Sequence, residues 1–125
     1  MSTKALTAVF DTSTSRAGAR LTLLAIADNA DDDGLAWPGV ERLANMTAQT
    51  ERIVLRQIAA LEKSGELYVH HREGRVNHYV IKLLGSDALS RALIKLAAKV
   101  GVDKIELPTP DPNDTGDSPI TPDPI

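Results

Sequence analysis

The chain has 125 residues, a formal net charge of −3 and no cysteine. This length suits one domain, and the absence of cysteine excludes a disulfide scaffold and a thiolate zinc site while suiting a reducing cytoplasm. No apolar run approaches the roughly 18 residues that a membrane span requires, and the N-terminus does not resemble a signal peptide. We therefore expect a cytoplasmic protein with no membrane partner.

The charge is divided unevenly along the chain. Residues 1–104 carry 14 Lys and Arg against 12 Asp and Glu, whereas residues 105–125 carry no basic residue and 5 acidic ones. Between Arg42 and Lys82 there are 7 basic and 4 acidic residues, and His70, His71 and His78 can add charge near phosphates. This is a modest basic footprint for a nucleic-acid binder.

The first predicted helix runs from Ala17 to Ala30. The polar stretch before it, residues 12–16, predicts a loop or a frayed end. Leucine, isoleucine and alanine cover more than half of the helix circumference, so we expect burial on several sides. The run Asp31 to Gly34 ends the helix, because a glycine after a polar run is a strong helix breaker.

Two further helices are predicted with a short turn between them. Pro38 suits the first position of the second helix, which should run to about Met46. Residues 47–49 form the turn. Thr50 then suits the N-cap of a third helix that runs to about Ser64, where Gly65 favours the left-handed C-cap conformation.

The third helix is predicted to have one buried and one exposed side. Its buried stripe consists of Val54, Ile58 and Leu61. The polar residues that then project near its N-terminal half are Gln49, Thr50, Arg52 and Arg56. Because an arginine can bridge O6 and N7 of guanine, we predict that this side contacts base edges in a major groove, with Arg52 and Arg56 as the leading candidates.

Two large aliphatic residues, Ile53 and Leu55, flank the core position Val54. Both cannot join a narrow buried stripe, so one of them is expected to be exposed. It can touch a thymine methyl group, pack against a partner subunit, or lie at the margin of the core. The sequence alone leaves these three alternatives open.

A basic hairpin is predicted after Gly65. Residues 66–72 and 77–83 have strand-like composition, with Tyr79, Ile81 and Leu83 expected on one face of the second strand. The connection carries Arg72 and Arg75. In a hairpin that approaches DNA, such arginines position the protein on phosphates rather than read the sequence.

The run LLAIADNADDDGLAWPGVERLANMTAQTERIVLRQIAALEKSGELYVHHREGRVNHYVI resembles the winged helix-turn-helix domain near the N-terminus of plasmid and phage replication-initiation proteins. It is similar, more loosely, to bacterial winged-helix transcription regulators. The resemblance covers residues 16–83 and implies a mainly α fold with a small β-hairpin wing. It also implies that Thr50, Arg52 and Arg56 lie on the recognition helix, and it places the following residues on the wing: Arg72, Arg75 and Asn77.

Three segments are therefore predicted: the winged helix-turn-helix domain at 1–84, an amphipathic helix at 85–104 and a Pro/Asp-rich disordered tail at 105–125. Ser86 suits the cap of the amphipathic helix, whose stripe is Leu89, Leu93, Leu96 and Val100. This helix can fold back on the domain or form a homodimer through residues 86–100. The tail can link to a further module, dock on a replication or transcription protein, or compete with DNA for the basic face.

No motif for catalysis, a metal or a cofactor is recognised. The chain has no Walker loop, nucleophile elbow or histidine-rich metal spacing, and its four aromatic residues do not predict a platform for single strands. We expect no enzyme activity and no cofactor. The predicted function is sequence-specific binding of double-stranded DNA in phage or plasmid replication initiation; the alternatives are transcription regulation and a protein adaptor without DNA binding.

Overall fold

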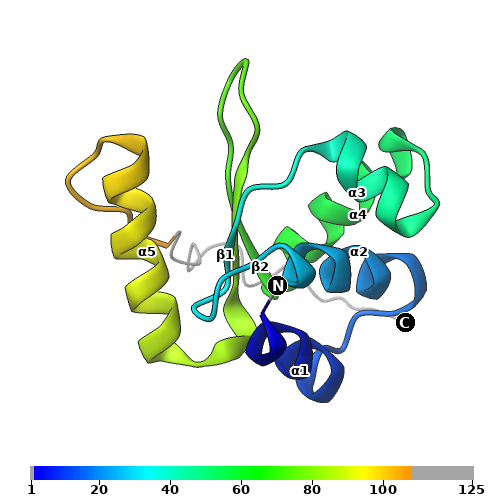
Figure 1. The fold of residues 1–125 in the computed structure, drawn as a ribbon, viewed down its shortest axis with the longest axis horizontal. Coiled ribbons are helices and arrows are strands. Elements are labelled where there is room, and N and C mark those ends of the chain that lie inside the picture. The colour runs from blue at the N-terminus through cyan, green and yellow to red at the C-terminus, as the bar shows by residue number, and fades with distance from the viewer. Residues whose placement is uncertain (1, 108–125) are drawn as a thin grey trace, which may run out of the picture.

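The computed structural model describes residues 2–107, so the predicted tail lies outside the described residues from position 108 onward. The elements, in chain order, are α1 (Thr3–Thr12), α2 (Ala17–Asp28), β1 (Leu35–Ala36), α3 (Val40–Thr47), α4 (Glu51–Ser64), β2 (Leu67–His70), β3 (His78–Ile81), the 3-10 turn η1 (Lys82–Leu84) and α5 (Ser86–Val100). Figure 1 shows the β2–β3 hairpin projecting from the body, with α5 on one side of the sheet and the other helices on the opposite side.

The three strands form one antiparallel sheet in the order β1-β3-β2. Leu35 of β1 pairs with Val80 of β3, and on the other side of β3 Tyr68 of β2 pairs with Val80 as well. The central strand β3 is buried along its whole length. As predicted, Tyr79 and Ile81 share one face, which meets the main core, while Val80 lies on the opposite face, which is covered by α5.

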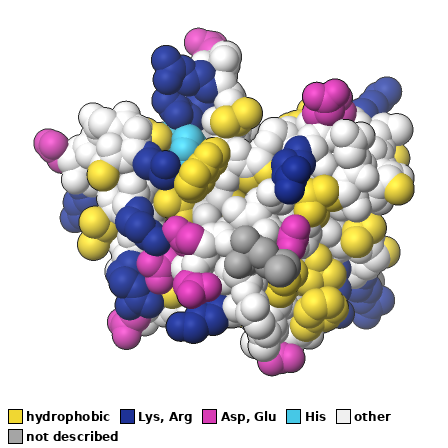
Figure 2. All heavy atoms as spheres, in the orientation of Figure 1, with side chains coloured by type: hydrophobic (Ala, Val, Ile, Leu, Met, Phe, Trp, Pro, Cys, Tyr) yellow, Lys and Arg dark blue, Asp and Glu magenta, His cyan; other side chains and the backbone are white. Residues whose placement is uncertain are grey.

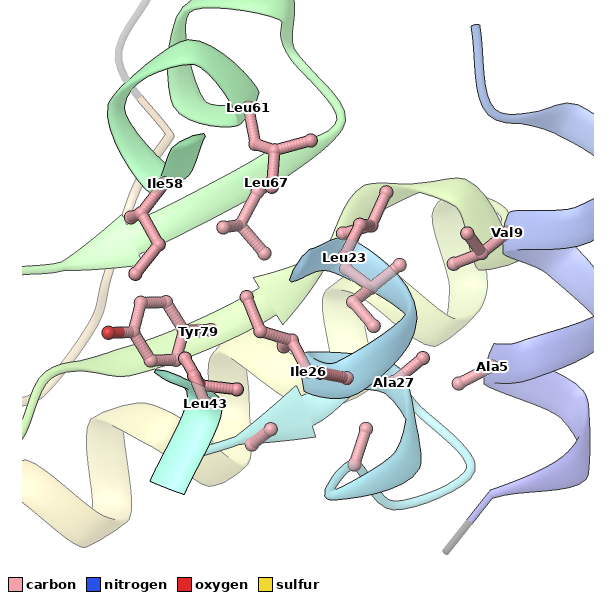
Figure 3. Close-up of a cluster of buried hydrophobic side chains, with 14 of the residues drawn as sticks. Ala5, Val9, Leu23, Ile26, Ala27, Leu43, Ile58, Leu61, Leu67 and Tyr79 are labelled. Atoms are coloured by element: carbon pink, nitrogen blue, oxygen red, sulfur yellow. The ribbon is translucent and has the colours of Figure 1, made fainter. Parts of the chain in front are cut away.

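The main core lies between the sheet and α1 to α4. In Figure 3, Tyr79 of β3 lies among Leu43 of α3 and Ile58 of α4, and Leu23 and Ile26 of α2 lie on the same side of the sheet. All five side chains are almost completely buried. This aliphatic core fixes α4 against α2 and α3, and so determines which side of α4 faces solvent.

The second face of the sheet is covered by α5. Its Ala92 and Leu96 form a separate buried cluster with Leu35 and Val80, and Leu89, Leu93 and Val100 pack at its margin. In the part of the chain that the structure describes, the predicted apolar stripe of this helix thus lies against its own domain. Ser86 begins the helix but does not cap it, because the N-cap is Gly85 and no side chain makes the capping bond.

Ion pairs add to the attachment of α5. Lys95 Nζ lies 2.7 Å from an oxygen of Asp31 and 2.8 Å from one of Asp33, and Arg91 Nε lies 3.0 Å from Asp33. Hydrogen bonds from Lys95 and Arg91 hold the pKa of Asp33 below its usual value. The acidic turn that ends α2 is therefore used to hold α5.

The N-terminal helix α1 was not predicted. Ser2 caps it by accepting a hydrogen bond from the N–H of Ala5, and its own hydroxyl donates to Asp32 at 2.8 Å. Ala5 and Val9 are its buried residues, and both belong to the main core. Half of its ten residues are apolar and half are polar, and a helix this short is stabilised mainly by its packing, here against α2.

The segment between α1 and α2, residues 13–16, is fixed by Glu66. Its carboxylate accepts hydrogen bonds from the Ser13, Thr14 and Ser15 hydroxyls and from the Thr14 N–H, at 2.7 to 3.0 Å. Burial raises the pKa of Glu66, but these hydrogen bonds outweigh it and leave the pKa below its usual value. Of the two predictions for this polar segment, a loop or a frayed end, the structure shows a loop, partly exposed and held by Glu66.

Candidate nucleic-acid interface

The tight turn between α3 and α4 depends on Ala48. This residue is the C-cap of α3 and has φ 55° and ψ 39°, in the left-handed region. Pro38 was predicted to begin α3, but the helix starts at Val40 with Gly39 as its N-cap, and Pro38 lies before it as a buried residue. The two helices and their short turn form a helix-turn-helix.

Helix α4 begins and ends as predicted. The Thr50 hydroxyl accepts a 3.1 Å hydrogen bond from the N–H of Ile53, and Gly65 ends the helix with φ 87°. Its buried residues are Val54, Ile58 and Leu61. With that stripe turned inward, helical periodicity of 3.6 residues per turn puts Arg52 and Arg56 on the opposite side.

Arg52 and Arg56 are both exposed. Neither guanidinium forms an ion pair or a side-chain hydrogen bond with any group among residues 2–107. Their i,i+4 spacing places two like charges close together, which destabilises an isolated helix by about 0.2 to 0.5 kcal/mol. An anionic ligand would relieve this repulsion.

Lys63 was not singled out from the sequence. It is exposed and follows Arg56 by seven residues, so it continues the same side of α4 toward the C-terminus. The i, i+4, i+11 spacing of Arg52, Arg56 and Lys63 was a signal that could have revealed it. Together these side chains form a basic line along the exposed side of α4.

Gln49 is placed differently from the other predicted contacts. Its Nε2 donates to the hydroxyls of Thr22 and Thr47 at 3.0 and 2.9 Å, and its side chain lies against Gly18 of α2. The amide is therefore used inside the protein, where it ties the turn to α2.

The wing is the loop between β2 and β3, residues 71–77. Arg75 at its tip is exposed, and Arg72 at its base is partly exposed. Figure 2 shows Lys and Arg side chains gathered on this projecting hairpin. A groove of ≈ 450 Å³ lies between the wing and the start of α3, lined by Arg75, Val76 and Asn77 on one side and by residues 38–40 on the other.

Asn77, predicted as a wing contact, closes the wing. Its Oδ1 accepts a 2.9 Å hydrogen bond from the backbone N–H of Arg72. The loop tip has Gly74 with φ 70°, a conformation that glycine adopts without strain. Asn77 therefore acts on the shape of the wing, while the two arginines carry its charge.

His78 does not add charge to this surface at neutral pH. It is buried at the base of the wing, with its ring centroid 5.7 Å from that of Trp37. Burial lowers the pKa of His78, and the nearby positive charges of Arg72, His70 and Lys99 lower it further. The expectation that all three histidines could contribute charge was wrong for this one.

In the described part of the chain, residues 2–107, neither a metal-binding cluster nor a membrane-spanning helix is found. No group of three or more His, Asp or Glu side chains within this range could hold a metal ion. None of its helices is both long and apolar enough to cross a bilayer.

Residues 16–66 match the model of a family of helix-turn-helix domains. The match covers α2, α3, the turn and α4, and ends where β2 begins. No curated protein and no solved structure matches the chain. The match and the fold together support a helix-turn-helix DNA-binding domain, and the adjoining β2–β3 hairpin makes the fold a mainly α winged helix-turn-helix, as predicted.

Proposed function

We propose that this domain binds double-stranded DNA sequence-specifically, with α4 in the major groove and the wing on the phosphate backbone. The observation that carries the proposal is the pair Arg52 and Arg56. Both are exposed on the side of α4 opposite its core stripe, and no carboxylate within residues 2–107 is paired with either. A B-DNA major groove, about 12 Å wide, admits one helix, and each guanidinium can then bridge O6 and N7 of a guanine.

The wing contacts would add affinity without reading bases. Arg72 and Arg75 extend the positive surface away from α4, and Asn77 keeps the hairpin closed. Thr50, exposed at the N-terminus of α4, is placed for a phosphate or base contact through its hydroxyl. Gln49 is left out of the interface, because its side-chain amide donates hydrogen bonds to Thr22 and Thr47 and so ties the turn to α2.

The binding test compares the wild type with Arg52→Ala/Arg56→Ala on duplexes selected from a random pool. We expect the double variant to lose at least about 30-fold in affinity, since each bidentate arginine contributes about 1 to 3 kcal/mol of base discrimination. The control is Lys4→Ala/Lys104→Ala, which removes the same charge from two exposed side chains outside the helix-turn-helix and the wing. Unchanged duplex affinity in the arginine variant would favour a protein adaptor instead.

We further propose that the process served is replication initiation in a phage or plasmid. The support is the resemblance of residues 16–83 to the winged helix-turn-helix domains of such initiators. Mapping the bound sites across the genome tests this step separately from DNA binding. Clustering at an origin is expected, and clustering at promoters would replace the proposal by transcription regulation.

A further inference from the structure

One large aliphatic side chain lies among the proposed DNA-contacting residues. Leu55 is 52% exposed and belongs to neither buried cluster. It follows Arg52 by three residues and precedes Arg56 by one, and all three side chains are exposed. Packing in the core of the domain therefore does not explain why a leucine occupies this position.

The wing side of α4 is the side on which Leu55 lies. Glu62, seven residues further along the helix, is on the same side, and its carboxylate lies 3.2 Å from Nε2 of His71 at the start of the wing. Ala59, at i+4 from Leu55, is also exposed. Leu55 and the small Ala59 therefore form an apolar strip on α4 between the arginines and the wing.

Ile53 provides the contrast. It is 37% exposed and precedes Gln57 by four residues, and Gln57 lies against Gly18 of α2. Ile53 is therefore on the α2 side of α4, away from the wing. Of the two aliphatics that flank Val54, Leu55 is the one that faces the side on which DNA would lie.

We propose that Leu55 recognises the 5-methyl group of a thymine next to the guanines contacted by Arg52 and Arg56. This inference rests on the proposed function and makes it more specific. The thymine methyl is the apolar group that base pairs present in the major groove, and aliphatic side chains contact it there. An apolar partner protein fits the surroundings less well, because it would have to desolvate the neighbouring arginines.

The experiment uses the duplex selected from a random pool and replaces each thymine in turn by deoxyuridine, which removes only the methyl group. For the wild type we expect one thymine, beside an arginine-contacted guanine, whose replacement weakens binding about fourfold, as expected for removing one buried methyl. In Leu55→Ala, duplexes with thymine and with deoxyuridine at that position should bind equally. Ile53→Ala, the matched control, should keep the thymine preference.

Three outcomes would overturn the inference. If no thymine position responds to deoxyuridine while Arg52→Ala/Arg56→Ala abolishes binding, DNA recognition stands and the role of Leu55 falls. The same holds if Ile53→Ala, and not Leu55→Ala, removes the preference. If no duplex is enriched from the pool at all, the proposed function fails together with this inference.

Discussion

Asn77 and Arg72 are joined across the base of the wing by a 2.9 Å hydrogen bond from the backbone N–H of Arg72 to Oδ1 of Asn77. This bond connects the two ends of a loop whose tip has few other constraints. In Asn77→Ala we expect faster hydrogen exchange at the Arg72 amide and a loss of up to about fivefold in duplex affinity, the equivalent of one hydrogen bond. Val76→Ala, at an exposed neighbouring side chain, should leave the exchange rate unchanged. An unaltered Arg72 amide in Asn77→Ala would contradict a bracing role.

The wing arginines should affect affinity and its salt dependence, but not sequence preference. Each phosphate contact contributes about 0.9 to the slope of log K against log salt concentration. Arg72→Ala/Arg75→Ala should therefore make this negative slope shallower by about 2, while the preferred bases remain the same. Titrations of one selected duplex and its point variants at several salt concentrations measure both quantities. A changed preference at any base position would show that the wing reads bases.

The Glu66 carboxylate should make the domain sensitive to acid. Because its pKa is lowered on folding from the usual 4.5, its stabilisation is complete above that value and is lost as the pH falls through the lower pKa of the folded state. Glu66→Gln should lower the free energy of unfolding near pH 7 by about 2 kcal/mol, because hydrogen bonds to a charged acceptor are lost. The difference in the free energy of unfolding between variant and wild type should shrink below pH 4.5 in urea titrations.

Glu73→Gln, at an exposed position on the wing, serves as the control and should stay within about 0.5 kcal/mol of the wild type. A difference for Glu66→Gln that does not change with pH would contradict this account.

Ala48 occupies a backbone conformation that suits glycine better. Its φ of 55° places it in the left-handed region, which costs an L-residue with a side chain about 1 kcal/mol. Ala48→Gly should therefore leave the free energy of unfolding unchanged or raise it by up to about 1 kcal/mol. Relief of the backbone strain stabilises the folded state, and the added entropy of glycine in the unfolded chain opposes this gain. Ala60→Gly, at an exposed position inside α4, should destabilise it by about 1 kcal/mol. Equal destabilisation by both substitutions would show that the turn is not strained at Ala48.

Local signals in the sequence predicted the helix-turn-helix well. The capping hydroxyl of Thr50, the left-handed Gly65 and the apolar spacing from Val54 to Leu61 all act within one helix, so the chain itself specifies them. The short hairpin and its two arginines were also predicted from the sequence, because turn residues separate two segments of strand-like composition.

Features that depend on long-range contacts were missed. Strand β1 has two residues and exists through its pairing with β3, and α1 depends on its packing against α2. The side-chain amide of Gln49 is of a type that can bind base edges, but it donates a hydrogen bond to the hydroxyl of Thr22, which is 27 positions away in the chain. A side-chain amide can serve either purpose, and only the tertiary arrangement decides between them.

The proposed function requires that Arg52 and Arg56 enter a major groove and bind guanine. The most direct test replaces each guanine of the selected duplex by 7-deazaguanine, which removes the N7 acceptor and leaves base pairing intact. We expect substitution of two guanines to weaken binding of the wild type strongly, and we expect Arg52→Ala and Arg56→Ala each to become insensitive at one of these two positions. Wild-type binding that is the same for every substituted duplex would show that neither arginine binds N7 of a guanine in the major groove.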